Sequence, residues 1–254
     1  MPFIFATSMD NKCINVGIVN YLNVQPLLYG LQKMPANEMN LQHFYPAQVA
    51  EKLLDGSIDI GLVPVAIIPQ LPFAKIIGNH CIASNNNVAS VCLFSKVPLH
   101  EISTVLLDFQ SRTSVQLVQI LFKHFWKKEV QFIPANEHFI NEIKDTTAAV
   151  IIGDRALQNL QNFPFIYDLA EAWKSFTGLP FVFAAWVSNK AIESNFIIKF
   201  EIANALGLNK INEIVAKISF PFYDLHKYYT ENISYTFDYK KLKGLERFLE
   251  FIKV

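Results

Sequence analysis

The sequence predicts an α/β protein with two lobes and a ligand cleft between them. Short apolar runs alternate with segments of helical periodicity, which is typical of sheets with largely parallel strands. Two long β-rich runs, residues 88–95 and 180–188, flank what reads as a complete small α/β unit. A chain that leaves one lobe along a strand and returns along another makes the outer lobe discontinuous, as in hinged proteins that bind ligands between two lobes.

The first predicted lobe consists of residues 1–92 and 184–254, and the second of residues 93–183. The first lobe opens with a strand at 14–19, which runs into a polar loop. Pro26 then fits the first turn of a helix, because the N–H that proline lacks has no partner there anyway. The next predicted elements of this lobe are a helix at 46–55 and a strand at 58–63.

The second lobe is predicted to have strands at 104–107 and 148–152, a helix at 114–126 and another helix from about Arg155. Helix 114–126 carries apolar residues at i, i+3, i+4 and i+7, which indicates one buried face. The chain beyond the second β-rich run is predicted to be helical. Residues 228–239 follow no regular period and stay unassigned.

The composition indicates a folded domain that does not bind nucleic acid. Hydrophobic residues make up 52% of the 254 residues and charged residues 17%, which excludes disorder. The 22 Lys and Arg residues balance 22 Asp and Glu residues, whereas nucleic-acid binding favours an excess of positive charge.

Cysteine usage and hydropathy point to the cytoplasm. Cys13, Cys81 and Cys92 are odd in number and form no C-x-x-C pair, so neither a disulfide framework nor a zinc site is predicted. The first residues lack the basic segment of a signal peptide, and no apolar stretch approaches the roughly 18 residues that a membrane span needs. We therefore expect a cytoplasmic protein without membrane association.

Polar loops that follow a strand and open a helix are the candidate binding elements. They are residues 20–23, 108–114 and 153–155. Ligands of open α/β sheets bind where such strand ends meet, and a helix N-terminus favours a carboxylate or phosphate. Ser111, Thr113 and Ser114 would add hydroxyl donors. Helix capping and an anion site are equally good interpretations of these three residues.

Single polar residues in these loops have simpler interpretations. Asn23 is more typical of a turn than of a ligand contact, Arg112 could clamp a carboxylate or be solvated, and Asp154 could cap the following helix. No histidine has metal-ligand spacing, and no nucleophile elbow, phosphate loop or dinucleotide fingerprint is present. The residues alone thus predict a two-lobed protein that binds a small anion.

One long string carries a resemblance to a known family. Residues 173–186, WKSFTGLPFVFAAW, resemble the chorismate dehydratases of menaquinone biosynthesis. The supporting strings are residues 16–18, 21–23, 54–61, 111–115 and 152–154. The resemblance runs from about Asn15 to the C-terminus. It implies a fold similar to the periplasmic type II binding proteins, with chorismate as the small-molecule substrate and no metal or organic cofactor.

The resemblance implies loss of water from chorismate to give 3-[(1-carboxyvinyl)oxy]benzoate, the first step of the futalosine route to menaquinone. We hypothesise that Asn23 and Ser90 act at the reacting ring. The expected substrate-binding residues are Tyr21, Ser111, Arg112, Thr113, Ser114, Gly153, Asp154, Thr177 and Gly178. The matched motifs hold no His, Glu or Lys as general base, so the enolpyruvyl carboxylate of the substrate is the predicted proton acceptor.

The chain departs from the family pattern in two places. Asn86 and Asn87 stand where Gly-Pro is usual, and Asn tolerates a left-handed turn. Pro64 and Ile67 lie in a stretch that usually holds a hydroxyl and an acidic residue.

Three other functions share the predicted architecture. A non-catalytic anion-binding protein of a transporter would be expected to carry a signal peptide or lipid anchor. The later naphthoate-forming enzyme of the same pathway has a Ser-Pro-Cys-Pro-Asn-type opening, which this chain lacks. A sensor domain would come with a DNA-binding segment.

Overall fold

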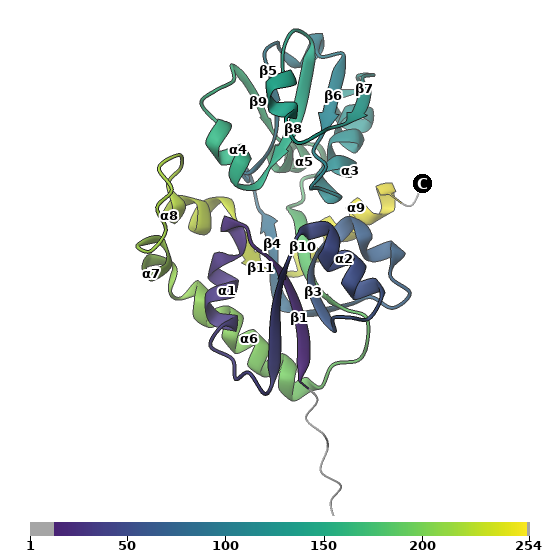
Figure 1. Cartoon of the computed structure of the whole chain (residues 1–254). Coiled ribbons are helices and arrows are strands. Elements are labelled where there is room, and N and C mark those ends of the chain that lie inside the picture. Colours follow the sequence, from purple (N-terminus) through teal and green to yellow (C-terminus); the bar gives the residue numbers. More distant parts are fainter. Residues whose placement is uncertain (1–12, 253–254) are drawn as a thin grey trace, which may run out of the picture.

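The computed structural model describes residues 13–252, which form two β-sheets joined by two chain crossings (Figure 1). The first sheet has the strand order β11-β4-β10-β3-β1-β2, and the second has the order β7-β6-β8-β5-β9. The first contains β1 (Ile14–Val19), β2 (Met39–Phe44), β3 (Ile60–Pro64), β4 (Lys75–Ser84), β10 (Phe181–Ser188) and β11 (Ser234–Thr236). The second contains β5 (Val91–Ser95), β6 (Thr104–Leu107), β7 (Gln131–Pro134), β8 (Thr147–Ile152) and β9 (Phe165–Asp168).

Helices follow most strands. The α-helices are α1 (Gln25–Leu31), α2 (Pro46–Leu54), α3 (Thr113–Ile120), α4 (Gly153–Asn159), α5 (Leu169–Thr177), α6 (Ser194–Leu208), α7 (Ile211–Val215), α8 (Leu225–Lys227) and α9 (Tyr239–Ile252). The 3-10 helices are η1 (Leu22–Val24), η2 (Val65–Gln70), η3 (Leu99–Glu101) and η5 (Phe139–Glu142). Two π-helical segments are η4 (Leu121–Trp126) and η6 (Tyr228–Asn232). Among the residues described, no helix is long and apolar enough to span a membrane.

Several predicted elements are confirmed with small shifts at their ends. The strands predicted at 14–19 and 104–107 coincide with β1 and β6, and the helix predicted from residue 46 is α2. The helix predicted at 114–126 is α3, which starts one residue earlier and continues as η4. The left-handed residue Lys127 ends this continuous segment.

The sheets are mixed rather than largely parallel, which corrects the prediction. Parallel pairing joins β1 to β2 and β3, and joins β6 to β7 and β8. The strands that bracket the crossings, β4, β5 and β10, pair antiparallel with their neighbours. A chain that enters a lobe from the other lobe reaches the sheet from the opposite end, so its strand runs against the parallel set.

The predicted lobe boundaries fall inside two strands. Boundaries at 92/93 and 183/184 cut β5 and β10, whereas the structure keeps each strand whole in its own sheet. Val91 and Cys92 thus belong to the second sheet, and residues 181–183 belong to the first. The first crossing is residues 85–90, between β4 and β5. The second is residues 169–180, between β9 and β10, and it includes α5.

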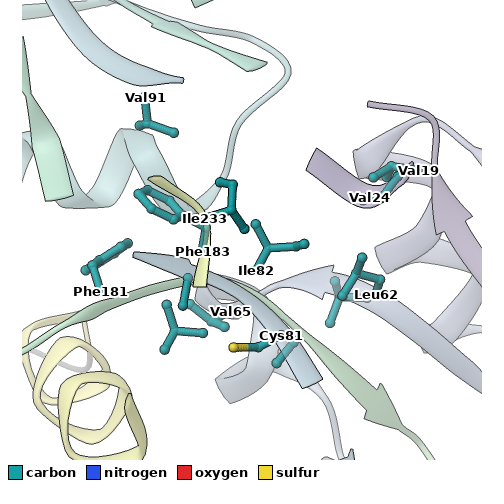
Figure 2. Packing of buried hydrophobic residues seen from close by; sticks show 14 of the residues in the cluster. Val19, Val24, Leu62, Val65, Cys81, Ile82, Val91, Phe181, Phe183 and Ile233 are labelled. Carbon is teal, nitrogen blue, oxygen red and sulfur yellow. The ribbon is translucent and has the colours of Figure 1, made fainter. Parts of the chain in front are cut away.

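One hydrophobic cluster runs through both sheets. Figure 2 shows Phe183 and Ile82 of the first sheet near Val91 of the second, with Val24 and Leu62 farther away in the same cluster. These side chains form the apolar floor between the lobes. All five side chains are at most 8% exposed. The apolar floor between the lobes is therefore continuous with the core.

Two glycines determine how closely α1, the helix after the loop of Asn23, packs against α6. A Cβ on Gly30 of α1 would lie 1.7 Å from the carbonyl oxygen of Ala203, and one on Gly207 of α6 would lie 1.6 Å from that of Pro26. No side chain fits at either place, so α1 and α6 pack backbone against backbone. This contact fixes the position of α1, and with it the loop that carries Asn23.

Candidate active site

A cavity opens between the two sheets at the ends of β1, β6 and β8. Its space, counted with the solvent at its mouth, is about 670 Å³. Apolar side chains form much of its wall: Val19, Val24, Leu62, Ile82, Val88, Val91, Ile152 and Phe183. Figure 2 labels all of these except Val88 and Ile152. Its polar side chains are Tyr21, Asn23, Ser90, Gln110, Ser111, Thr113 and Ser114. Among residues 13–252, no charged side chain lines it.

Asn23 brings an unsatisfied acceptor to this cavity. It lies in η1, and its side-chain Oδ1 is buried with no hydrogen-bond partner among the described residues. Its backbone carbonyl accepts a hydrogen bond of 2.9 Å from the Tyr235 hydroxyl. A buried polar atom without a partner costs about 1–3 kcal/mol, so Oδ1 is a natural place for a ligand donor.

Ser90 is held by contacts from several elements. Its Oγ accepts a 2.8 Å hydrogen bond from the Tyr228 hydroxyl, and its carbonyl accepts one of 2.7 Å from the Gly153 N–H. The preceding residue, Ala89, has a left-handed φ of 61°. Ser90 is 1% exposed and lines the cavity.

The loop before Ser90 is tied to Asp168. One carboxylate oxygen of Asp168 accepts from the N–H groups of Val88 and Ala89, at 2.8 and 2.7 Å. The other caps α5 by accepting from Ala170 and Glu171. Burial raises the pKa of Asp168 to about 6, while these four N–H groups pull it back toward the ordinary value. One carboxylate therefore joins this crossing to the start of the other.

The Asn pair of the same crossing does not take the left-handed conformation that its sequence allows. The left-handed residue is Ala89. Asn86 instead pairs with Ser84, since its N–H donates to the Ser84 hydroxyl and its carbonyl accepts from it. At the other departure from the family pattern, Pro64 lines the cavity and Ile67 is buried in the core.

The hydroxyls at the start of α3 have different tasks. Ser111 Oγ accepts from the Ser114 N–H at 3.0 Å, which is a capping contact. Thr113 donates its hydroxyl proton to the Phe183 carbonyl at 3.1 Å and accepts from the Ala66 N–H at 3.3 Å. Thr113 therefore fastens α3 to the first sheet. Ser114 lines the cavity, whereas Arg112 is exposed and does not.

The third predicted loop supports the first one. Gly153 lines the cavity beside the Tyr21 ring, with a φ of 64° that favours glycine. Asp154 does not line the cavity; its Oδ1 accepts from the Leu22 N–H at 3.1 Å, at the start of η1. Burial raises the pKa of Asp154. Asp154 thus positions the loop of Asn23 from the other sheet.

Tyr21 and Gln110 meet across the cleft. The Tyr21 hydroxyl donates to Gln110 Oε1 at 2.9 Å, and Arg155 donates to the same oxygen at 3.0 Å. Arg155 also pairs with the buried Asp108 at 2.8 Å. Burial raises the pKa of Tyr21 to about 12, so its hydroxyl stays protonated. Sequence reasoning missed Gln110, because nothing in a loop sequence indicates contact with a residue 89 positions away.

Thr177 and Gly178 do not line the cavity. Thr177 donates to the Trp173 carbonyl at 2.8 Å and accepts from the Leu179 N–H at 3.1 Å, while Gly178 ends α5 with a φ of 75°. The most distinctive string of the sequence is therefore a helix end and a buried strand. In the described part of the chain, no cluster of three His, Cys, Asp or Glu residues is arranged to hold a metal.

Two sheets with a cleft between them define a fold of the periplasmic-binding-protein kind, and solved structures agree. The aliphatic sulphonate binding protein SsuA of Escherichia coli is 14% identical, with a TM-score of 0.66 over 95% of this chain and 87% of its own. An Archaeoglobus fulgidus protein is 10% identical, with a TM-score of 0.70 over 95% and 97%. These likenesses concern the fold alone.

The sequence places the chain more narrowly. The profile of the menaquinone biosynthesis family matches residues 14–253, so the chain belongs to that family. A chorismate dehydratase of Thermus thermophilus is 28% identical over 192 residues, which are 67% of this chain and 68% of that relative. Both findings agree with the resemblance seen in the sequence.

Proposed function

We propose that the protein is a chorismate dehydratase, which removes water from chorismate to give 3-[(1-carboxyvinyl)oxy]benzoate in the futalosine route to menaquinone. The observation that carries the proposal is the uncharged, apolar-floored cavity in a chain of the menaquinone biosynthesis family. The Thermus relative adds support through its name. The apolar wall suits a six-membered carbon ring, and the polar groups suit its substituents.

The reaction removes the C4 hydroxyl and the C3 hydrogen of chorismate, and the ring becomes aromatic. C3 is joined through the C1–C2 double bond to the carbon that bears the ring carboxylate. Removal of the C3 proton therefore moves negative charge onto that carboxylate. Donors fixed where this charge develops lower the barrier, and each such donor typically contributes about a hundredfold or more in rate.

We assign Asn23 and Ser90 to the reacting ring. Asn23 lines the cavity and its buried Oδ1 has no hydrogen-bond partner among the described residues, and Ser90 lines the same cavity. The enolpyruvyl carboxylate takes the C3 proton and passes it to the departing C4 hydroxyl, which leaves as water while the electron pair of the C3–H bond completes the aromatic ring. The absence of Asp, Glu, His and Lys from the described cavity wall supports this assignment of the base to the substrate.

A carboxylate of the substrate is assigned to the start of α3. Ser111 and Ser114 line the cavity there, and the first N–H groups of a helix favour negative charge. The Thr113 hydroxyl is already engaged with Phe183 and Ala66, so its part is to hold this helix in place. Tyr21 and Gly153 lie next to each other and also line the cavity.

The test is to incubate the purified protein with chorismate and to follow the products by chromatography with mass detection. The expected product is lighter than chorismate by one water and co-elutes with authentic 3-[(1-carboxyvinyl)oxy]benzoate. Chorismate that stays unchanged but raises the melting temperature would instead support the non-catalytic anion-binding protein. Unchanged chorismate without any shift in melting temperature would contradict both functions.

A further inference from the structure

We propose that Tyr228 is a positioning residue of this site, and that its hydroxyl orients the Ser90 hydroxyl so that the Ser90 proton points into the cavity. The inference rests on the proposed function for its kinetic consequence. The hydrogen bond itself can be tested without a substrate.

The geometry leaves the proton of the Ser90 hydroxyl without an acceptor among the described residues. A serine hydroxyl has one proton and two lone pairs. The Tyr228 hydroxyl donates to Ser90 Oγ at 2.8 Å and so occupies one lone pair. No other hydrogen bond to Ser90 Oγ occurs among the described residues, and Ser90 lines the cavity. The serine proton is therefore available to a ligand.

The backbone of Ser90 is already fixed, which makes the rotation of its side chain the variable that Tyr228 controls. Asp168 holds the two residues before it, and the Gly153 N–H holds its carbonyl. Serine has three staggered rotamers, and a donor at one fixed place selects among them. Without that donor, the hydroxyl could turn to a different acceptor.

Tyr228 is itself well placed to act as a permanent donor. It is fully buried in η6, its ring lies 5.6 Å from that of Tyr229, and an edge contact of 6.3 Å joins it to Tyr223. Burial raises the pKa of Tyr228 well above its ordinary value, so it keeps its proton. A phenol that keeps its proton is no acid in the reaction. Its contribution is to hold the serine oxygen.

The kinetic test compares Tyr228→Phe with Tyr223→Phe. Tyr223 belongs to the same packed region, and its hydroxyl donates to Asn232 Oδ1 at 3.0 Å rather than to a residue of the cavity wall. We expect Tyr228→Phe to lower kcat about tenfold with KM within about twofold, the effect of one lost hydrogen bond in the transition state. Tyr223→Phe should stay within about twofold in both. Equal losses in the two variants would overturn the proposal.

A double-mutant cycle separates positioning from general support of the fold. If Tyr228 acts through Ser90, adding Tyr228→Phe to Ser90→Ala lowers the residual turnover no further. If Tyr228 supports the fold alone, the loss is the same in both backgrounds, which would contradict the inference. Melting curves of all four proteins establish that each one is folded.

If the wild type does not convert chorismate, the hydrogen bond between Tyr228 and Ser90 can still be tested by a measurement without substrate. That result would refute the proposed function and leave the hydrogen bond to be tested directly. In proton NMR spectra, the resonance of the Tyr228 hydroxyl is identified by its loss in Tyr228→Phe. We expect Ser90→Ala to shift it, and Ser114→Ala to leave it in place. A resonance that does not respond to Ser90→Ala would overturn the inference.

Discussion

Asp168 holds Ala89, the residue before Ser90, in the left-handed conformation by accepting its N–H at 2.7 Å. A left-handed non-glycine residue is uncommon and costs of order 1–3 kcal/mol, so it persists only where its surroundings enforce it. The same oxygen also accepts from Val88, and the other oxygen caps α5. The position of Ser90 thus depends on a carboxylate from β9, the edge strand that pairs with β5.

Replacing this carboxylate tests that dependence. Each oxygen of Asp168 accepts from two backbone N–H groups. In Asp168→Asn, one oxygen is replaced by an amide donor, so the two N–H groups that face it lose their acceptor. We expect the free energy of unfolding to fall by about 2–3 kcal/mol, and turnover to fall with it. Urea unfolding measures the first quantity. Glu171→Gln, at an exposed neighbour, is the control and should change little.

The raised pKa of Asp168 predicts that its contribution to folding stability falls as pH rises. The folded pKa is about 6 against an ordinary value of 3.8, so the folded state binds this proton more tightly than the unfolded state. The stability from this group is present below about pH 4 and is lost as pH rises through about 6. We expect the stability difference between wild type and Asp168→Asn to fall across this window. A difference that rises with pH would contradict the assignment.

The contact between α1 and α6 predicts a penalty at Gly207. Alanine favours a helix over glycine by about 1 kcal/mol, but its Cβ would lie 1.6 Å from the backbone oxygen of Pro26. The clash dominates, and we expect Gly207→Ala to lower the free energy of unfolding by about 2 kcal/mol or more. Asn195→Ala, on the exposed side of α6, is the matched control. Equal stability of the two variants would contradict this packing.

Substitutions at Thr113 test whether its hydroxyl joins the two lobes or contacts the ligand. Thr113→Val leaves the Ala66 N–H and the Phe183 carbonyl without their partner, so we expect a loss of about 1–3 kcal/mol in unfolding free energy. Thr113→Ser keeps both hydrogen bonds and should recover most of that loss. If Thr113→Val instead weakens only chorismate binding, the hydroxyl contacts the ligand.

The Tyr21–Gln110 contact predicts an effect on affinity. Tyr21→Phe removes the 2.9 Å hydrogen bond between the lobes, which is typically worth about 0.5–1.5 kcal/mol. We expect the Kd for the reaction product, 3-[(1-carboxyvinyl)oxy]benzoate, to rise about threefold to tenfold, measured by titration calorimetry. Tyr29→Phe removes a tyrosine hydroxyl bond to Glu213 on the exterior and should leave the Kd unchanged. A shift of equal size in both variants would count against the contact.

Local signals in the sequence predict the elements near the cavity. The apolar strand β1, the loop of Asn23 and the hydroxyl-rich start of α3 are all visible in short windows of sequence. The edge strands β7 and β9 are short and have no fully buried residue, so their pattern is weak. The crossing at Val88 is as apolar as a strand because it is buried between the lobes, which is why its sequence predicts a strand.

Residues that act through distant partners are the ones that sequence reasoning could not place. Tyr228 lies 138 positions from Ser90, and Tyr235 lies 212 positions from Asn23, in a segment without regular period. No window of sequence contains such a pair. Thr177 and Gly178 present the opposite difficulty, because a distinctive string indicates kinship without saying which of its residues face a ligand.

The uncharged wall of the cavity has a consequence for how binding responds to the medium. Tyr21 is the wall's one ionisable side chain among the described residues, and its pKa of about 12 keeps it neutral. A guest anion therefore meets only fixed dipoles, and the charge of the complex is the charge that the guest brings. Added salt has no ion pair among these wall residues to screen, and a change of acidity near neutrality leaves the charge of the wall itself unchanged.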